Sequence, residues 1–176
     1  MRRVAVLVVC LLAAFSCVKE NRETTYAGQE TRIATFLQSK VTDTTWFVNN
    51  DGAYRLTLKE GAGSALQSGG VLSFYYGGYV FNGSVSTGNL FATNHKETAT
   101  KAGWDTSDDS RFSVLTVDLQ QSQLVEGLSK GLVGAKAGEH AYIVFSGKYG
   151  FGDRIYGSIP ANAALIYEVW IESVNE

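Results

Sequence analysis

Apolar and polar residues alternate along much of the chain after residue 50, and this period-two pattern predicts β-strands. In AYRLTLKE, Tyr54, Leu56 and Leu58 share one face and the residues between them are polar. Such a strand packs one face on a core and leaves the other face wetter. Comparable strand signals occur in VLSFYYGGYVF (71–81), FSVLTVDL (112–119), HAYIVFS (140–146) and ALIYEVWIESV (164–174), and a shorter one begins at Leu90 and Phe91.

A helical period appears before the first of these strands. In QETRIATFLQSK (29–40), Ile33, Phe36 and Leu37 fall three and four residues apart. This spacing predicts a short amphipathic helix, which is too short to be stable alone and should dock on the folded domain. The polar residues ahead of it are typical of a tether. We therefore expect a tether and a short N-terminal helix over residues 17–50, followed by the main domain over 51–176.

A second helical segment, SQLVEGLSKGLVG (122–134), lies between two of the predicted strands. Its apolar residues form a stripe at helical spacing, with Ser122 as a candidate N-cap and Gly134 as a candidate terminator. Because one short helix accompanies several antiparallel strands, the pattern predicts an α+β fold in which a sheet wraps a single helix.

Two features interrupt the strand pattern. Gly77 and Gly78 lie inside the strongest strand signal, where glycines indicate a bulge or a close backbone approach. The polar segment ATNHKETATKAGWDTSDDSR (92–111) is a long excursion between strands. Loops of this length are often functional or mobile, so a lid or a substrate-contact loop is one interpretation of it.

The first residues have the pattern of a secretory signal. Two arginines precede an uninterrupted apolar run over residues 4–15, which is too short to span a membrane. Ser16 directly before Cys17 resembles a bacterial lipobox, in which the signal is cleaved and the cysteine thiol is acylated. We expect a lipoprotein-type signal peptide over 1–16 and a lipid anchor on Cys17. The protein would then lie in the bacterial cell envelope, on the periplasmic or surface side of the outer membrane, with simple secretion as the alternative.

Composition narrows the possible chemistry. The net charge is −2 and no basic stripe is present, which argues against a nucleic-acid partner. The only cysteines, Cys10 and Cys17, fall in the export segment, so the remaining domain has no internal disulfide. His95 and His140 do not have a metal-site spacing, and DTSDDS (105–110) lacks the glycine and spacing of a calcium loop. We expect neither a metal nor a cofactor.

Three spaced motifs near the C-terminus carry a more specific signal: LVEGL at 124–128, YGFG at 149–152 and GSIPANAALIYE at 157–168. Together they resemble the C-terminal half of the FKBP-type peptidyl-prolyl cis-trans isomerases. The segment LSFYYGGYVFNGSVSTGNLFA (72–92) is similar to an earlier strand of that family. The resemblance covers residues 51–174 and implies an FKBP-like antiparallel β-sheet wrapped around one short α-helix. It also implies isomerase activity on X–Pro bonds, here in exported, proline-containing polypeptides.

By this resemblance, an apolar aromatic bowl would hold the prolyl ring of the substrate. The residues that it assigns to catalysis are Tyr75, Phe91, Val125, Phe151 and Tyr167, and those that it assigns to substrate binding are Leu124, Leu128 and Ile159. The backbone N–H of Val125 would hold a substrate carbonyl. Without the motifs, each of these residues would be interpreted as core, since aromatic side chains on strands usually pack inside.

Three positions depart from the family pattern. Ala92 stands where the family has an aspartate, Phe151 replaces a tyrosine whose hydroxyl donates to the substrate, and Leu128 replaces a tryptophan floor. Loss of a principal transition-state donor lowers a rate by roughly 10²–10³-fold. The departures therefore predict weakened activity and leave two alternatives open: a non-enzymatic binding or chaperone domain, and a purely structural module. The oligomeric state is open as well.

Overall fold

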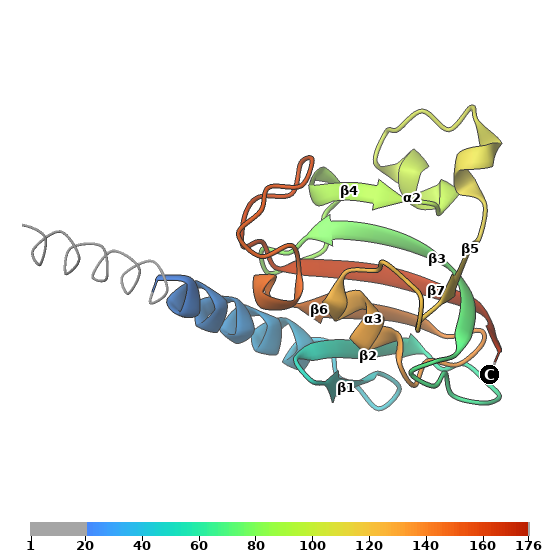
Figure 1. Cartoon of the computed structure of the whole chain (residues 1–176), viewed down its shortest axis with the longest axis horizontal. Coiled ribbons are helices and arrows are strands. Elements are labelled where there is room, and N and C mark those ends of the chain that lie inside the picture. The colour runs from blue at the N-terminus through green and yellow to red at the C-terminus, as the bar shows by residue number, and fades with distance from the viewer. Residues whose placement is uncertain (1–20, 176) are drawn as a thin grey trace, which may run out of the picture.

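The structure is a computed structural model that describes residues 21–175, so the expected signal peptide and Cys17 lie outside the described residues. Seven strands form one antiparallel sheet in the order β1-β2-β6-β7-β3-β4, and β5 also pairs with β3 (Figure 1). The strands are β1 (Trp46–Asn50), β2 (Ala53–Lys59), β3 (Val71–Val80), β4 (Leu90–Thr93), β5 (Leu115–Asp118), β6 (His140–Phe145) and β7 (Leu165–Asn175).

Two short α-helices, α2 (Lys96–Lys101) and α3 (Glu126–Leu132), accompany the sheet, and residues 21–38 are helical as well. Within residues 21–175, no helix is long and apolar enough to cross a membrane. The sheet and the helix α3 form the expected α+β arrangement.

Each face of the sheet packs on its own hydrophobic core, because successive side chains of a strand point to opposite faces. Along β7, Leu165, Tyr167 and Val169 join the core beneath α3. The intervening Ile166 joins a second core on the opposite face, together with Val144 of β6. This division decides which side chains of each strand can reach a site beside α3.

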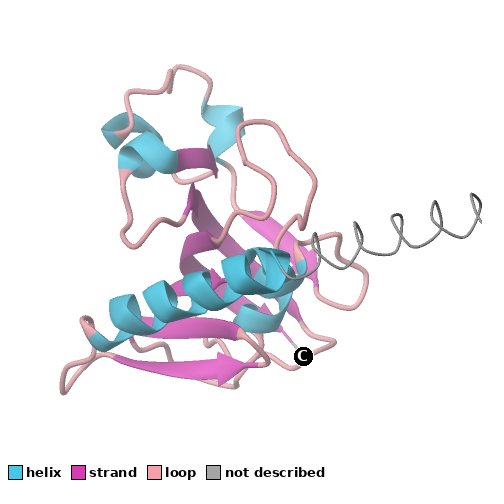
Figure 2. Ribbon diagram, turned by 90° about the vertical axis from the view of Figure 1, so that its left-hand side faces the viewer, coloured by secondary structure: helices cyan, strands magenta, loops and turns pink. Residues whose placement is uncertain are grey.

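The N-terminal helix covers the second core, as expected. Figure 2 shows it lying along the sheet, and Ile33, Phe36 and Leu37 are buried there. The expectation of a tether over residues 17–27 is wrong for the described part, because residues 21–27 already belong to the helix. Polar contacts with the domain hold this first part of the helix, and a pattern of apolar residues does not reveal such contacts.

Helix α3 is shorter than the segment 122–134 that predicted it. Val125 is its N-cap, so Ser122 does not cap it, and Val133 is its C-cap. The helix lies so close to β6 that a Cβ atom on Gly127 would overlap the ring of Phe145, so glycine at this position permits the contact. This close approach brings the start of α3 to the middle of the sheet, where the candidate site lies.

A buried ion pair fastens the end of α3 to the sheet. Arg55 on β2 donates through Nη1 to the carbonyl of Gly131, 3.0 Å away, and also to that of Val133. Its Nε lies 3.0 Å from Oε1 of Glu139, although the N–H is not aligned for a hydrogen bond. Burial lowers the pKa of the Arg55 guanidinium, and the Glu139 carboxylate counteracts that effect. A charged pair thus holds the helix that carries part of the site.

Two elements were not predicted from the sequence. The strand β1 forms the edge of the sheet beside β2, and its largely exposed residues show no clean alternation. The helix α2 lies inside the excursion 92–111, and only Thr98 and Ala99 of this helix are buried. The predicted irregularity at Gly77 and Gly78 is confirmed, since the register with β4 shifts between Gly78 and Tyr79.

Candidate functional site

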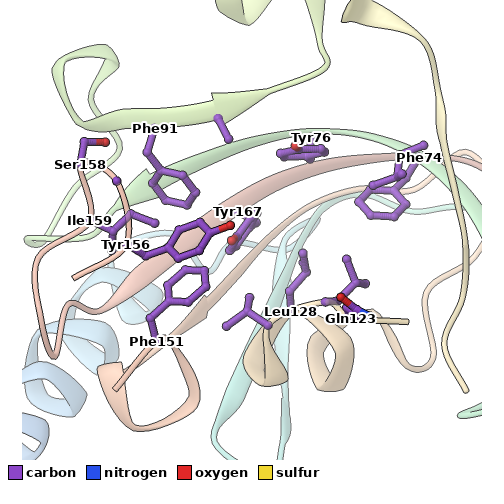
Figure 3. A pocket seen from close by; sticks show the side chains of 15 residues that line it. Phe74, Tyr76, Phe91, Gln123, Leu128, Phe151, Tyr156, Ser158, Ile159 and Tyr167 are labelled. Atoms are coloured by element: carbon purple, nitrogen blue, oxygen red, sulfur yellow. The ribbon is translucent and has the colours of Figure 1, made fainter. Parts of the chain in front are cut away.

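An apolar pocket of about 410 Å³ opens between the start of α3, the inner face of β3 and β7, and the loop after β6 (Figure 3). Its lining is mostly aromatic and aliphatic, and we call it the aromatic pocket. The lining residues are Phe74, Tyr76, Phe91, Ala92, Leu115, Gln123, Leu124, Val125, Leu128, Phe151, Tyr156, Gly157, Ser158, Ile159 and Tyr167.

The structure brings together nearly all the side chains that the sequence assigned to a bowl. Those that line the aromatic pocket are Phe91, Leu124, Val125, Leu128, Phe151, Ile159 and Tyr167. They come from β4, from the start of α3, from the loop after β6 and from β7. Segments as far apart as Phe91 and Tyr167, 76 positions along the chain, therefore converge on one concave site, which is the usual form of a small-ligand site.

The assignment of Tyr75 to this bowl is wrong, because Tyr76 lines the pocket instead. Alternation along β3 turns Tyr75 to the opposite face, where its ring centroid lies 6.1 Å from that of His95. That face also carries Trp170, which stacks on His95 at 4.0 Å. Tyr75 thus belongs to a separate surface hollow on the other side of the sheet.

The ring of Tyr167 forms the inner wall of the pocket. The ring of Phe91 meets it edge-on, with centroids 5.7 Å apart, and the ring of Phe145 stacks on it with centroids 6.0 Å apart. The absence of a side chain on Gly78 permits this arrangement, since a Cβ there would lie 2.7 Å from Phe91. The close backbone approach expected at the glycine pair therefore serves the pocket directly.

The deep hydroxyl groups of the pocket are neutral donors. Burial raises the pKa of the Tyr167 hydroxyl far above its ordinary value, and the neighbouring Tyr76 raises it further. Burial alone raises the pKa of Tyr76. Because a protonated phenol donates a hydrogen bond without carrying charge, the pocket stays uncharged at neutral pH.

A backbone donor, the N–H of Val125, belongs to a pocket-lining residue at the start of α3. The carbonyl of Val125 accepts hydrogen bonds from the N–H groups of Leu128 and Ser129 at 3.0 and 3.1 Å. Within residues 21–175, the N–H of Val125 itself has no protein acceptor. An unpaired N–H beside an apolar cavity can bind a carbonyl of a ligand.

The segment 147–162, which we call the pocket loop, supplies the outer wall. Phe151 and Tyr156 stack with ring centroids 4.7 Å apart and planes 2° from parallel. Tyr156 and Ile159 exchange backbone hydrogen bonds of 3.1 and 2.9 Å across a turn. At this turn Gly157 has a φ of 57°, which glycine adopts without strain. Pro160, the only proline of the chain, follows the turn directly.

The N-terminal helix holds both ends of the pocket loop. Gln29 is buried, and its amide accepts from the N–H of Gly147 at 2.8 Å and donates to the carbonyl of Asn162 at 2.6 Å. Tyr26 donates to the side chain of Asn162 at 2.8 Å. The wall of the aromatic pocket therefore depends on a helix that lies about 130 residues earlier in the chain.

Replacing Gln29 with leucine should loosen the pocket loop. The change leaves the N–H of Gly147 and the carbonyl of Asn162 without their partner, which costs about 1–3 kcal/mol for buried groups. Urea denaturation should show the loss of stability, and amide hydrogen exchange should quicken over 147–162. The exposed Thr31→Ala on the same helix is the matched control, and equal exchange in both variants would contradict this role.

The excursion 92–111 does not form a lid over the aromatic pocket. Of its residues only Ala92 lines the cavity, while His95, Thr98 and Lys101 border a hollow on the opposite face of the sheet. The described residues contain no cluster of three or more potential metal ligands, although His95 and His140 both stack on Trp170. The polar loop between α2 and β5 is thus separate from the site.

Several pocket residues were missed from the sequence. Tyr76 and Phe74 could have been found, because they share the apolar face of β3 with the buried Leu72. Gln123 and Tyr156 lie in irregular segments, where no periodic signal indicates which way a side chain points. Their placement depends on the turns that precede and follow them.

Comparison with known proteins agrees with this geometry. The sequence model of one family, the FKBP-type peptidyl-prolyl cis-trans isomerases, matches residues 62–172. FK506-binding protein 1 of Aspergillus oryzae is 26% identical over 124 residues, covering 70% of this chain and 99% of the fungal protein. Peptidyl-prolyl cis-trans isomerase FKBP9 of Mus musculus is 29% identical over 105 residues, covering 60% of this chain but 15% of the mouse protein.

Solved structures share the fold. A peptidyl-prolyl cis-trans isomerase from Pseudomonas syringae superposes with a TM-score of 0.57 at 16% identity, covering 86% of this chain and 96% of that one. FkpA from Escherichia coli superposes with a TM-score of 0.56 at 17% identity, covering 96% of this chain and 71% of that one. At such low identity the superpositions establish a common architecture, and the residues of the pocket must carry any argument about activity.

Proposed function

Because the chain belongs to the FKBP-type peptidyl-prolyl cis-trans isomerase family, we propose that it accelerates the rotation of X–Pro bonds in polypeptides. The observation that carries this proposal is the aromatic pocket, an apolar cavity of about 410 Å³ lined by Val125, whose backbone N–H has no acceptor among the described residues. A prolyl ring is compact and apolar, and the carbonyl preceding it needs a donor. The cavity combines an apolar space for the ring with a donor for the carbonyl.

The chemistry needs no nucleophile or metal. Amide resonance sets a rotation barrier of about 18–20 kcal/mol, and exchange of X–Pro bonds takes tens to hundreds of seconds. Twisting the bond removes resonance and reduces the charge separation of the amide, so a dry pocket favours the twisted form over the planar form. The N–H of Val125 would hold a flanking carbonyl while Tyr167 and Phe91 enclose the ring.

The departures from the family pattern support a slow enzyme. Leu128 gives the pocket a smaller floor than tryptophan, and neither Ala92 nor Phe151 offers a polar group. We therefore infer weak binding of the prolyl ring and modest turnover. The same three residues favour the second candidate function, a domain that holds apolar, proline-containing segments without isomerising them.

Refolding of a protein whose rate is limited by proline isomerisation separates the two functions. An isomerase shortens the slow refolding phase at substoichiometric concentration. A holding domain leaves that phase unchanged and instead suppresses aggregation in proportion to its own concentration. If the folded protein does neither, both candidate functions are refuted.

Replacing Leu128 with tryptophan should strengthen substrate binding. The larger ring fills part of the cavity floor and adds apolar contact worth about 1–2 kcal/mol, so KM should fall by about tenfold. Steady-state isomerisation of a prolyl peptide measures the change. Leu128→Met, which conserves volume, is the control and should leave KM nearly unchanged. An unchanged KM in the folded tryptophan variant would show that the prolyl ring does not rest on this floor.

We also propose that the protein is exported and anchored by a lipid on Cys17, so that its substrates are exported polypeptides. The apolar run over 4–15 and the Ser16–Cys17 pair support this proposal. Mass spectrometry of the N-terminal peptide from the native source provides the test. An acylated Cys17 at the N-terminus is the expected result, and a chain that keeps residues 1–16 would refute it.

A further inference from the structure

Tyr156 is an aromatic side chain of the pocket that no motif identified. It is 64% exposed, yet its ring stacks flat against Phe151 at 4.7 Å. Figure 3 shows its hydroxyl pointing from the pocket loop toward the middle of the aromatic pocket, on the side of Tyr167. An exposed ring held in this orientation needs an explanation beyond core packing.

The backbone fixes the position of Tyr156. Its N–H donates to the carbonyl of Ile159 at 3.1 Å, and its carbonyl accepts from the N–H of Ile159 at 2.9 Å. Ile159 is only 3% exposed and belongs to the core, so the turn is anchored at its inner end. The turn therefore restrains the backbone of Tyr156, and Phe151 packs on one face of its ring.

The hydroxyl of Tyr156 is available for a ligand. Among the described residues it makes no hydrogen bond, and the side chain is largely exposed. The side chains of Tyr76 and Tyr167 lie deeper, in buried surroundings that raise the pKa values of their hydroxyls. Phe151 has no hydroxyl, although the family pattern places a donating tyrosine there. The parallel stack therefore places the hydroxyl-bearing ring of Tyr156 directly beside the ring of Phe151, which has no hydroxyl.

We propose that the Tyr156 hydroxyl is the donor that holds a substrate carbonyl at the mouth of the aromatic pocket, and so compensates for the phenylalanine at 151. This proposal rests on the proposed function, since it names a further substrate-contacting residue of the same site. The stack serves as a support: Phe151 binds the face of the Tyr156 ring and keeps its hydroxyl over the cavity.

The alternative is that Tyr156 only shields Phe151 from water. Tyr156→Phe distinguishes the two roles, because it keeps the stacked ring and removes only the hydroxyl. We expect kcat/KM on a prolyl peptide to fall by about tenfold, which corresponds to one hydrogen bond. Adding Phe151→Tyr to that variant restores a hydroxyl on the adjacent ring and should recover most of the loss. Arg154→Gln, an exposed change in the same loop, is the control.

The experiment uses the purified full chain and two readouts, the isomerisation rate and the affinity for the same peptide from an NMR titration. If the natural protein isomerises and Tyr156→Phe does so equally well, the Tyr156 proposal is overturned and the proposed function stands. If the natural protein binds without isomerising, the proposed function fails, and a tenfold weaker affinity of Tyr156→Phe with rescue by Phe151→Tyr still supports the donor role. Equal affinities, or no binding by either protein, overturn it.

Discussion

Replacing Glu139 with glutamine is expected to lower the free energy of unfolding by about 3–5 kcal/mol, although the change is isosteric. Glu139 is 4% exposed, and its carboxylate lies against the guanidinium of Arg55, which is buried as well. Removing its charge leaves Arg55 buried without a counter-ion. In Glu139, one carboxylate oxygen accepts from the hydroxyl of Thr57 and the other accepts from the N–H of Lys136. The NH₂ group of glutamine replaces one of these oxygens and cannot accept, so it is placed against a donor.

Guanidinium or urea denaturation of the natural protein and the variant measures this loss. The control is Glu60→Gln, which breaks the exposed pair between Glu60 and Lys136 and should change stability by less than about 1 kcal/mol. A double variant that makes both Arg55 and Glu139 apolar should be more stable than Glu139→Gln, since no charge is left unpaired. If Glu139→Gln is no worse than the control, the pair does not hold α3 to the sheet.

Replacing Val125 with proline should lower kcat/KM by about 10²–10³-fold and leave the fold intact. Proline removes the N–H that we assign to the substrate carbonyl, and no described acceptor loses a hydrogen bond. The φ of Val125 is −58°, which lies within the range that proline adopts. The carbonyl of residue 125 can still accept from Leu128 and Ser129, so the start of α3 is preserved.

Val125→Ala is the matched variant for this test, because it keeps the N–H and removes only apolar contact with the pocket. We expect it to lose less than about tenfold in kcat/KM. Circular dichroism and thermal unfolding show whether both variants fold. If the folded proline variant is as active as the alanine variant, the N–H of Val125 plays no part in the reaction.

The sequence was most informative where motif and strand period agreed. The segment 149–168 placed Phe151, Ile159 and Tyr167 correctly, because a loop, a turn and a buried strand follow one another there with fixed spacing. Its limit appears at Tyr75 and Tyr76, two adjacent tyrosines before a pair of glycines. The motif fits either tyrosine. Only the alternation of side chains along β3, which places Tyr76 on the same face as the buried Leu72 and Phe74, decides between them.

Other features could not have been predicted, because they depend on contacts between distant segments. The amide of Gln29 binds backbone atoms of Gly147 and Asn162, and neither partner has a side-chain signature for that contact. The strand β1 is an edge strand with largely exposed residues, so its pattern is weak. Tyr156 lies on an irregular loop, where its orientation follows from a turn rather than from a period.

The most direct test of the proposed activity is cis–trans exchange in a short X–Pro peptide, measured by NMR exchange spectroscopy with a small amount of purified protein. We expect the exchange rate to rise in proportion to the protein concentration, and the effect to disappear with Val125→Pro. An unchanged exchange rate with a folded natural protein would contradict the proposal that the aromatic pocket catalyses prolyl isomerisation.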